Sequence, residues 1–167
     1  MLTFELIDKT REYLDYIEGH VMNVHKAWKE LQVKCSDMRF IYDDYVYRTI
    51  ESEVERHDLS KLSEDEFVQY REFFYPCADE KKKPIGKFWE HHKNNNQHHW
   101  ENWTVTCNSD DSHEWEVHCV HMVIDWMAMG YQFGDTSQQY YEANKDKIKL
   151  PEYAVKFIYE IFERIDA

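Results

Sequence analysis

The residues with the clearest chemical potential are histidines and aspartates spread along the chain, including one adjacent pair, His57-Asp58. A neighbouring His and Asp offer a metal ion one neutral nitrogen and one anionic oxygen. Further candidate ligands precede and follow the pair: His20, His92, His98, His99 and Asp125. Mn, Fe, Ni and Zn all accept imidazole and carboxylate, and two such ions can hold the attacking and leaving oxygens of a phosphoester. The pattern predicts a site for two divalent transition-metal ions whose identity the ligand types leave open.

Each of these residues also has a structural interpretation when it is taken alone. His20 suits a core histidine bonded to a carbonyl group, and His57-Asp58 suits a helix end followed by a turn. The segment 91–100 contains His91, His92, His98 and His99, and it could form an exposed polar loop. The conjunction of all these residues favours a metal site over a structural histidine network.

A later segment adds a carboxylate in apolar surroundings. His118, His121 and Asp125 follow i, i+3, i+7 spacing, which places them on one face of a helix. Asp125 stands between Ile124 and Trp126, where a buried carboxylate is costly unless it is paired or bound to a metal. The alternative is a hydrogen bond to Asp125 from a Trp or Tyr side chain.

The elements that must position these residues are all predicted to be helices. Apolar residues at helical spacing predict a helix over 3–33 with His20 on or beside its buried face. A second helix over 37–57 is expected to bring His57 and Asp58 to its end. Ser63 and Glu66 fit a capping box at the start of a third helix that ends before Pro76.

The rest of the chain alternates between predicted loops and helices. We expect a charged, solvated loop over 77–84 and an irregular loop over 94–113. Further helices are predicted from Pro84 through His92, and over 114–130, 137–149 and 151–165. Because no segment has strand periodicity, the predicted class is all-α, a single-domain helical bundle spanning residues 1–167.

Composition limits the classes of function. The 167 residues suffice for one domain with a core, and a 16% aromatic content predicts an aromatic-rich one. A net charge of −13 argues against binding to a nucleic acid duplex or an anionic membrane, although bound metals would still admit an anionic substrate. The four cysteines form no Cys-x-x-Cys pair, which argues against a cysteine-based zinc site. Without a signal-like or membrane-spanning segment, a cytoplasmic protein is expected.

Two resemblances extend this interpretation. The order His20, His57-Asp58, Asp125 resembles the HD-domain superfamily of metal-dependent phosphohydrolases. The run His57-Asp58-Leu59-Ser60-Lys61 is similar to the His-Asp-x-Gly-Lys motif of its cyclic-dinucleotide phosphodiesterase branch, with Ser60 in place of Gly. This resemblance implies an HD-like fold in which His20, His57, Asp58 and Asp125 hold one metal. Asp58 would bridge to a second metal, held by His92 and His98 with His99 or His121 as a further ligand.

The second resemblance covers nearly the whole chain and is to an uncharacterised family of phage and bacterial proteins, a domain of unknown function. It rests on Tyr16-x-x-x-His20-x-x-x-Val24, on His-Asp-x-Ser-Lys followed by a Glu and a Tyr (57–70), and on Asp125-Trp126. It also rests on two longer motifs, His92-x-x-x-Asn96-x-His98-His99-Trp100 and the Tyr-x-x-Asn-Lys-Asp-Lys run over 141–147. That family tends to have Glu where this chain has His121.

The expected function is a metal-dependent phosphohydrolase or phosphodiesterase that acts on a small phosphate ester, namely a nucleotide or cyclic nucleotide. Asp58 and Lys61 are the candidate catalytic residues, with Lys61 binding phosphate or remaining a surface lysine. Asn96 and His121 are candidates to orient a ligand or contact the substrate.

Two other functions fit the same residues. An HD-type di-iron oxygenase would use the same ligand types. A non-enzymatic phage-type protein would keep a structural metal and bind a host protein in the host cytoplasm.

Overall fold

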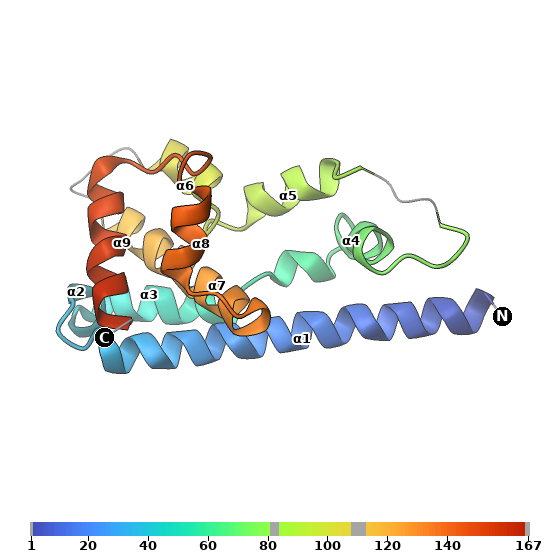
Figure 1. The fold of residues 1–167 in the computed structure, drawn as a ribbon, viewed down its shortest axis with the longest axis horizontal. Helices are drawn as coiled ribbons and strands as arrows, with labels where there is room; N and C mark the ends of the chain where they lie inside the picture. Colours follow the sequence, from blue (N-terminus) through green and yellow to red (C-terminus); the bar gives the residue numbers. More distant parts are fainter. Residues whose placement is uncertain (1, 81–83, 108–112, 166–167) are drawn as a thin grey trace.

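One long helix runs along the whole molecule. The computed structural model describes residues 2–80, 84–107 and 113–165. Helix α1 (Leu2–Lys34) lies along one side in Figure 1, with the N-terminus at one end of the molecule and the C-terminus near the other end of α1. The other elements are α2 (Arg39–Tyr42), α3 (Asp44–Glu55), the short 3₁₀ helix η1 (Leu59–Leu62), α4 (Phe67–Phe74), α5 (Lys87–Asn95), α6 (Trp100–Thr106), α7 (Glu114–Phe133), α8 (Ser137–Asn144) and α9 (Glu152–Ile165). The described residues contain no strand, which confirms the all-α class and the helical domain.

Helix α7 is the central element. It contacts α1, α3, α6, α8 and α9, and nearly every residue from Glu116 to Gly130 is buried. A helix that is apolar on all sides must be enclosed by its neighbours, which explains this position. Asp125 is one of the few incompletely buried residues of this stretch, with a side chain 18% exposed.

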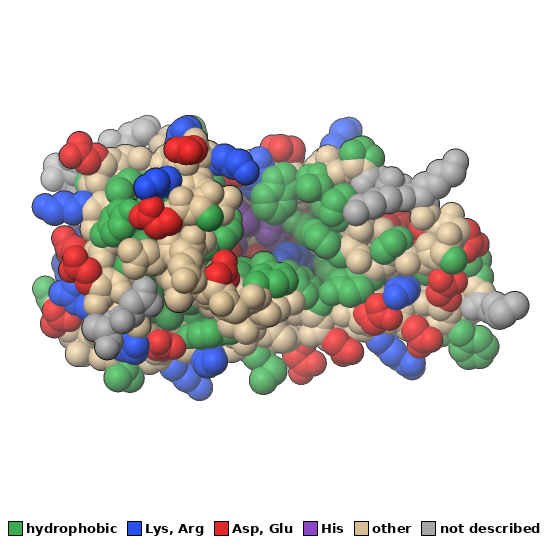
Figure 2. All heavy atoms as spheres, in the orientation of Figure 1, with side chains coloured by type: hydrophobic (Ala, Val, Ile, Leu, Met, Phe, Trp, Pro, Cys, Tyr) green, Lys and Arg blue, Asp and Glu red, His purple; other side chains and the backbone are tan. Residues whose placement is uncertain are grey.

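The apolar core is divided into two clusters. The larger cluster joins α7 to α3, α9 and the second half of α1. The smaller one joins the first half of α1 to α4 and α5 through Tyr13, Ile17, Tyr70 and Phe88. His20 follows Ile17 by three residues and precedes Val24 by four, so it lies at the boundary. On the face seen in Figure 2, histidine side chains lie at the bottom of a hollow between hydrophobic ones.

The predicted helix over 37–57 is wrong in its continuity. The structure divides it into α2 and α3 at Asp43, which caps α3 by accepting hydrogen bonds from the amides of Tyr45 and Val46 at 3.1 and 3.2 Å. Asp side chains favour this capping position over a helix interior. Since α3 ends at Glu55, the pair His57-Asp58 lies in the following turn.

The predicted capping box at Ser63 and Glu66 is also wrong. Helix α4 begins only at Phe67, and the Oγ of Ser63 has no hydrogen-bond partner among the described residues. The Glu66 carboxylate is fully buried and faces His91 and His92 instead. Charge-assisted bonds to imidazole are stronger than the capping bond that they replace.

Residues 94–113 are not a continuous irregular loop. They contain α6, whose Trp103 is fully buried in the larger core. Burial of this large ring outweighs the loop-favouring composition around it. The remaining part of that prediction, 108–112, lies outside the described residues, as do Lys81–Lys83 of the predicted charged loop.

Several helix ends differ from the predictions. Helix α5 begins at Lys87, after Gly86, and Pro84 precedes it without being its first residue. Helix α7 continues to Phe133, and α8 ends at Asn144. Among the described helices, none is both long enough and apolar enough to cross a membrane.

Two glycines provide a matched test of the packing around α7. A Cβ at Gly130 would lie 2.3 Å from the carbonyl oxygen of Asp135, whereas Gly19, exposed on α1, has nothing within 4 Å of its Cβ position. We expect Gly130→Ala to lower the free energy of unfolding by about 1–3 kcal/mol, because backbone must move. Gly19→Ala should raise it by about 0.5–1 kcal/mol. Urea unfolding measures both, and equal midpoints would contradict this close approach.

Candidate metal centre

Four potential ligand atoms converge from three parts of the chain, and we call them the first donor group. The Nε2 of His20 lies 2.9 Å from the Nε2 of His57, 3.5 Å from the Oδ2 of Asp58 and 3.2 Å from the Oδ1 of Asp125. The Nε2 of His57 lies 3.4 and 3.5 Å from the same two oxygens. Around a metal with bonds of about 2.1 Å, neighbouring ligand atoms are roughly 3.0–3.4 Å apart. The first donor group therefore fits a transition-metal ion.

The first donor group is strongly charged, and all its members except the partly exposed Asp125 are buried. Burial alone would raise the pKa values of Asp58 and Asp125. The neighbouring histidines, and Lys61 beside Asp58, instead hold the pKa of each carboxyl well below its usual range. Burial opposes a charge on His20, but its contacts with Asp125 and Asp58 raise the pKa of its ring to about 9. Protons thus compensate the carboxylates in the absence of a cation, and a bound divalent ion would displace them.

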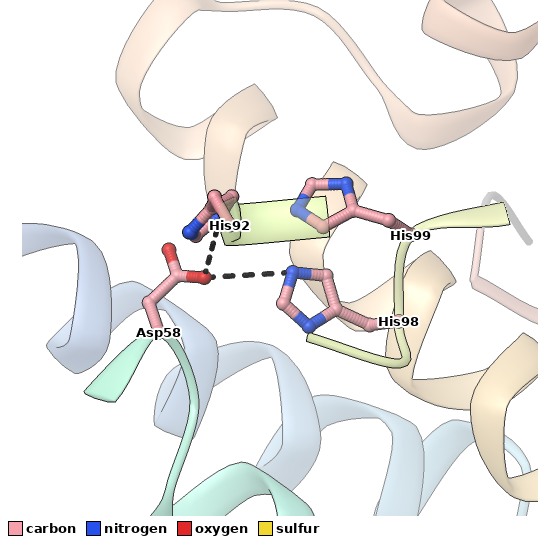
Figure 3. A group of neighbouring side chains, drawn as sticks. All are labelled: Asp58, His92, His98 and His99. Carbon is pink, nitrogen blue, oxygen red and sulfur yellow. Dashed lines mark ion pairs between the residues drawn. The ribbon is translucent and has the colours of Figure 1, made fainter. Parts of the chain in front are cut away.

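A second donor group uses the other oxygen of Asp58. The Oδ1 of Asp58 lies 3.3 Å from the Nε2 of His92 and 3.5 Å from the Nε2 of His98 (Figure 3). Together with His99, these residues bring one ligand atom each to within 4.8 Å of one another. The Nε2 of His99 is buried without a hydrogen-bond partner among the described residues. Burial lowers the pKa of His99 to about 4, so its ring is neutral and able to bind a metal.

Glu66 supports the second donor group and was missed by the sequence analysis. The Nδ1 of His92 lies 2.8 Å from the Oε2 of Glu66, while its Nε2 faces Asp58. A carboxylate that accepts the far N–H of a histidine fixes the tautomer and orientation that metal binding needs. The only signal in the sequence was the Glu that accompanies the His-Asp-x-Ser-Lys motif.

Asn96 also lies behind His92 rather than in front of it. Its Nδ2 donates to the Oγ of Ser60 at 2.7 Å and to the backbone oxygen of His92 at 2.7 Å. Asn96 thereby ties the end of α5 to η1, beside the Asp58 turn. Its role as an orienting residue stays a prediction.

His121 contacts the other face of His57. Its Nε2 lies 2.9 Å from the Nδ1 of His57. Burial, reinforced by the charge of His57, holds the pKa of His121 well below its usual value. A neutral His121 accepts the N–H of His57 and leaves the Nε2 of His57 facing the first donor group. Of the predicted helix face, His121 and Asp125 thus join the centre, whereas His118 lies elsewhere.

Lys61 is buried, so the surface-lysine interpretation is wrong. It is 8% exposed, and its Nζ lies 2.6 Å from the Oδ2 of Asp58. Its ammonium group also lies 5.7 Å from the ring centres of Tyr16 and Tyr70. Burial opposes its charge, but Asp58 and Tyr16 raise its pKa above the ordinary value, so it stays cationic.

A cavity of about 380 Å³ opens onto both donor groups. Most of its polar lining comes from the centre itself: His20, Asp58, Lys61, His98, His99 and Asp125; Glu101 and Asp135 add two further carboxylates. Much of the rest is aromatic: Tyr16, Tyr70, Phe74, Trp89, Trp100, Trp126, Phe133 and Tyr140. A concave, mainly apolar space with a few convergent polar groups is typical of small-molecule sites.

The fold and the centre define an all-α protein with buried His/Asp groups able to hold metal ions beside a cavity. The chain belongs to a family of unknown function, DUF5662, whose model matches residues 9–164. No curated protein and no solved structure matches the chain. Membership of a family of unknown function agrees with the second resemblance. The resemblance to the HD-domain superfamily, and the motifs that carry it, stay predictions.

The double role of Asp58 makes its substitution the first test of the centre. We expect Asp58→Asn to lose metal from both donor groups and to unfold at a lower temperature, because metal binding is linked to folding. Elemental analysis after reconstitution with Mn, Fe, Ni or Zn, together with thermal unfolding, measures both effects. Asp15→Asn, an exposed substitution on α1, is the control. Unchanged metal content in Asp58→Asn would exclude Asp58 as a metal ligand of the two donor groups.

Glu66 allows the two donor groups to be separated. Glu66→Gln removes the charge that orients His92, and we expect the weaker of two metal-binding steps to lose about 10–100-fold in affinity. The first donor group has no contact with Glu66 and should keep its metal. Calorimetric titration resolves the steps, with exposed Glu64→Gln as the control. Equal weakening of both steps would contradict this division.

Proposed function

We propose that this protein is a metal-dependent phosphohydrolase or phosphodiesterase that acts on a nucleotide or cyclic nucleotide. One observation carries the proposal: the two carboxylate oxygens of Asp58 face two different donor groups. Such a shared carboxylate suits two neighbouring cations, and the cavity gives a substrate access to both. Two bound ions would supply a water nucleophile at neutral pH and positive charge for phosphate oxygens.

The residues of the chain would then perform distinct tasks. His20, His57, Asp58 and Asp125 would hold one ion, and Asp58, His92, His98 and His99 the other. Lys61, which is cationic and lines the cavity, would donate a hydrogen bond to a phosphate oxygen as charge develops on it. His121 and Glu66 would keep the rings of His57 and His92 in the tautomers that face the ions.

The aromatic walls of the cavity support a nucleotide as the substrate class. Trp89, Trp100 and Trp126 all line the cavity beside the centre. Any of the nucleic acid bases can stack on such rings, while the phosphate reaches the end of the cavity formed by the His/Asp centre. A volume of about 380 Å³ suits a small ligand and is too small for a nucleic acid duplex.

The composition of the second donor group favours one alternative. Three imidazoles and a carboxylate also suit iron, so a di-iron oxygenase remains the second candidate. Oxygen consumption by the iron-loaded protein, with a mixed-valent iron pair, would favour the oxygenase.

The proposal is tested by activity of the reconstituted protein. The protein loaded with Mn, Fe, Ni or Zn is assayed against nucleoside monophosphates, cyclic mononucleotides and cyclic dinucleotides, with product separation by chromatography. We expect turnover that requires metal and is lost in Asp58→Asn. A fully loaded protein that hydrolyses none of these phosphoesters would overturn the proposal.

Lys61 provides a sharper prediction within that assay. Lys61→Met keeps the length of the side chain but removes its charge, so we expect kcat to fall by about 10²–10³-fold with metal content unchanged. Lys29→Met, an exposed substitution on α1, should behave as wild type. Full activity of Lys61→Met would restrict Lys61 to balancing the charge of Asp58.

A further inference from the structure

A third set of potential ligands lies outside both donor groups, where α6 meets α7. It consists of Cys107, Glu114 and His118, and one ligand atom from each lies within 4.8 Å of the other two. Cys107 directly follows α6 as its C-cap residue, and Glu114 is the first residue of α7. His118 follows Glu114 by four residues, which places both side chains on one face of α7. The cluster thus joins the two helices across their connection.

His118 supplies an independent sign that a ligand belongs there. It is 5% exposed, and its Nδ1 is buried with no hydrogen-bond partner among the described residues. A buried imidazole nitrogen without a partner costs free energy, and native proteins leave few such atoms unsatisfied. A metal ion bound to this nitrogen would remove that cost.

The surroundings favour a cation that enters from solvent. A surface cleft reaches His118 and Glu114, and the carboxylate of Glu53 lines the same cleft. Burial lowers the pKa of His118 despite the opposing effect of Glu114 and Glu53, so its ring is neutral near neutral pH. The cluster therefore offers a neutral nitrogen, a carboxylate and a thiol, and the nearby carboxylate of Glu53 is paired with Arg56.

We propose that Cys107, Glu114 and His118 form a third metal site, separate from the Asp58 centre, which binds a zinc-type ion. Zinc accepts Cys sulfur, His nitrogen and Glu oxygen in tetrahedral geometry, and water can take the fourth position. The thiolate makes this site softer than the Asp58 centre, whose donor groups contain only nitrogen and oxygen. The thiol proton is released on binding. No Cys-x-x-Cys pair is needed, because Glu114 and His118 take the place of further cysteines.

The position of the site indicates a structural role. Helix α6 directly follows His98 and His99, and α7 carries His121 and Asp125. An ion held by the end of α6 and the first turn of α7 would fix the two segments that bring these residues to the Asp58 centre. His118 lies only three residues before His121 on α7, so a shift of His118 would also shift His121.

Cobalt substitution of the full-length protein tests the proposal. Bound to a thiolate, Co²⁺ gives a sulfur-to-metal charge-transfer band in the near ultraviolet, which nitrogen and oxygen ligands do not give. We expect wild type to show this band, Cys107→Ser to lose it, and Asp58→Asn to keep it while losing the other ions. Cys35→Ser is the control, since Cys35 is a buried thiol in the turn after α1.

The test does not depend on the function proposed above, because its readouts are spectral and stoichiometric. Glu114→Gln, at an exposed position, is a second variant in case Cys107→Ser fails to fold, and its band should weaken or shift. Cys107→Ser should also bind one zinc fewer per chain and melt at a lower temperature in zinc than wild type. Absence of the band from cobalt-loaded wild type, or its persistence in Cys107→Ser, would overturn the proposal.

Discussion

The arrangement of the whole protein depends on the buried carboxylate of Asp58. Its backbone adopts the left-handed conformation, with φ 56° and ψ 19°, and it is the only non-glycine residue with positive φ among those described. This conformation is unfavourable for a residue with a Cβ, and a buried carboxylate without compensation is costlier still. Both costs are offset because the turn directs one oxygen toward His20 on α1 and Lys61, and the other toward α5 and the loop before α6. The same interaction therefore connects segments that are distant in sequence.

The division of the core into two clusters follows from this polar centre. Charged groups cannot share space with aliphatic side chains, so the apolar contacts lie on either side of them. Along α1, Ile17 belongs to the smaller cluster and Val24 to the larger, while His20 between them turns to Asp58 and Asp125. The clusters supply the hydrophobic free energy of folding, and the centre fixes how they are joined.

The sequence predicts which His and Asp residues gather better than it predicts the elements around them. His20, His57, Asp58, Asp125, His92, His98 and His99 all reach the two donor groups, because residue type limits what a buried His or Asp can do. The contact of Glu66 with His92 was not predicted, because the two residues are 26 positions apart and the local sequence around Glu66 fits a capping box instead. Helix α6 was not predicted, because the burial of Trp103 outweighs the loop-like composition of the segment. The Cys107, Glu114 and His118 cluster exists only once α6 is in place.

Charge balance links metal binding to substrate choice. Without metals, cationic Lys61 and protonated His20 balance the carboxylates of Asp58 and Asp125, while Glu101 and Asp135 add negative charge to the lining of the cavity. Two divalent ions would displace the histidine protons and leave an excess of positive charge at the same place. In a protein with a net charge of −13, the cavity would then attract a phosphate that the rest of the surface repels. Anion binding in this cavity should therefore require prior metal binding, whichever reaction follows.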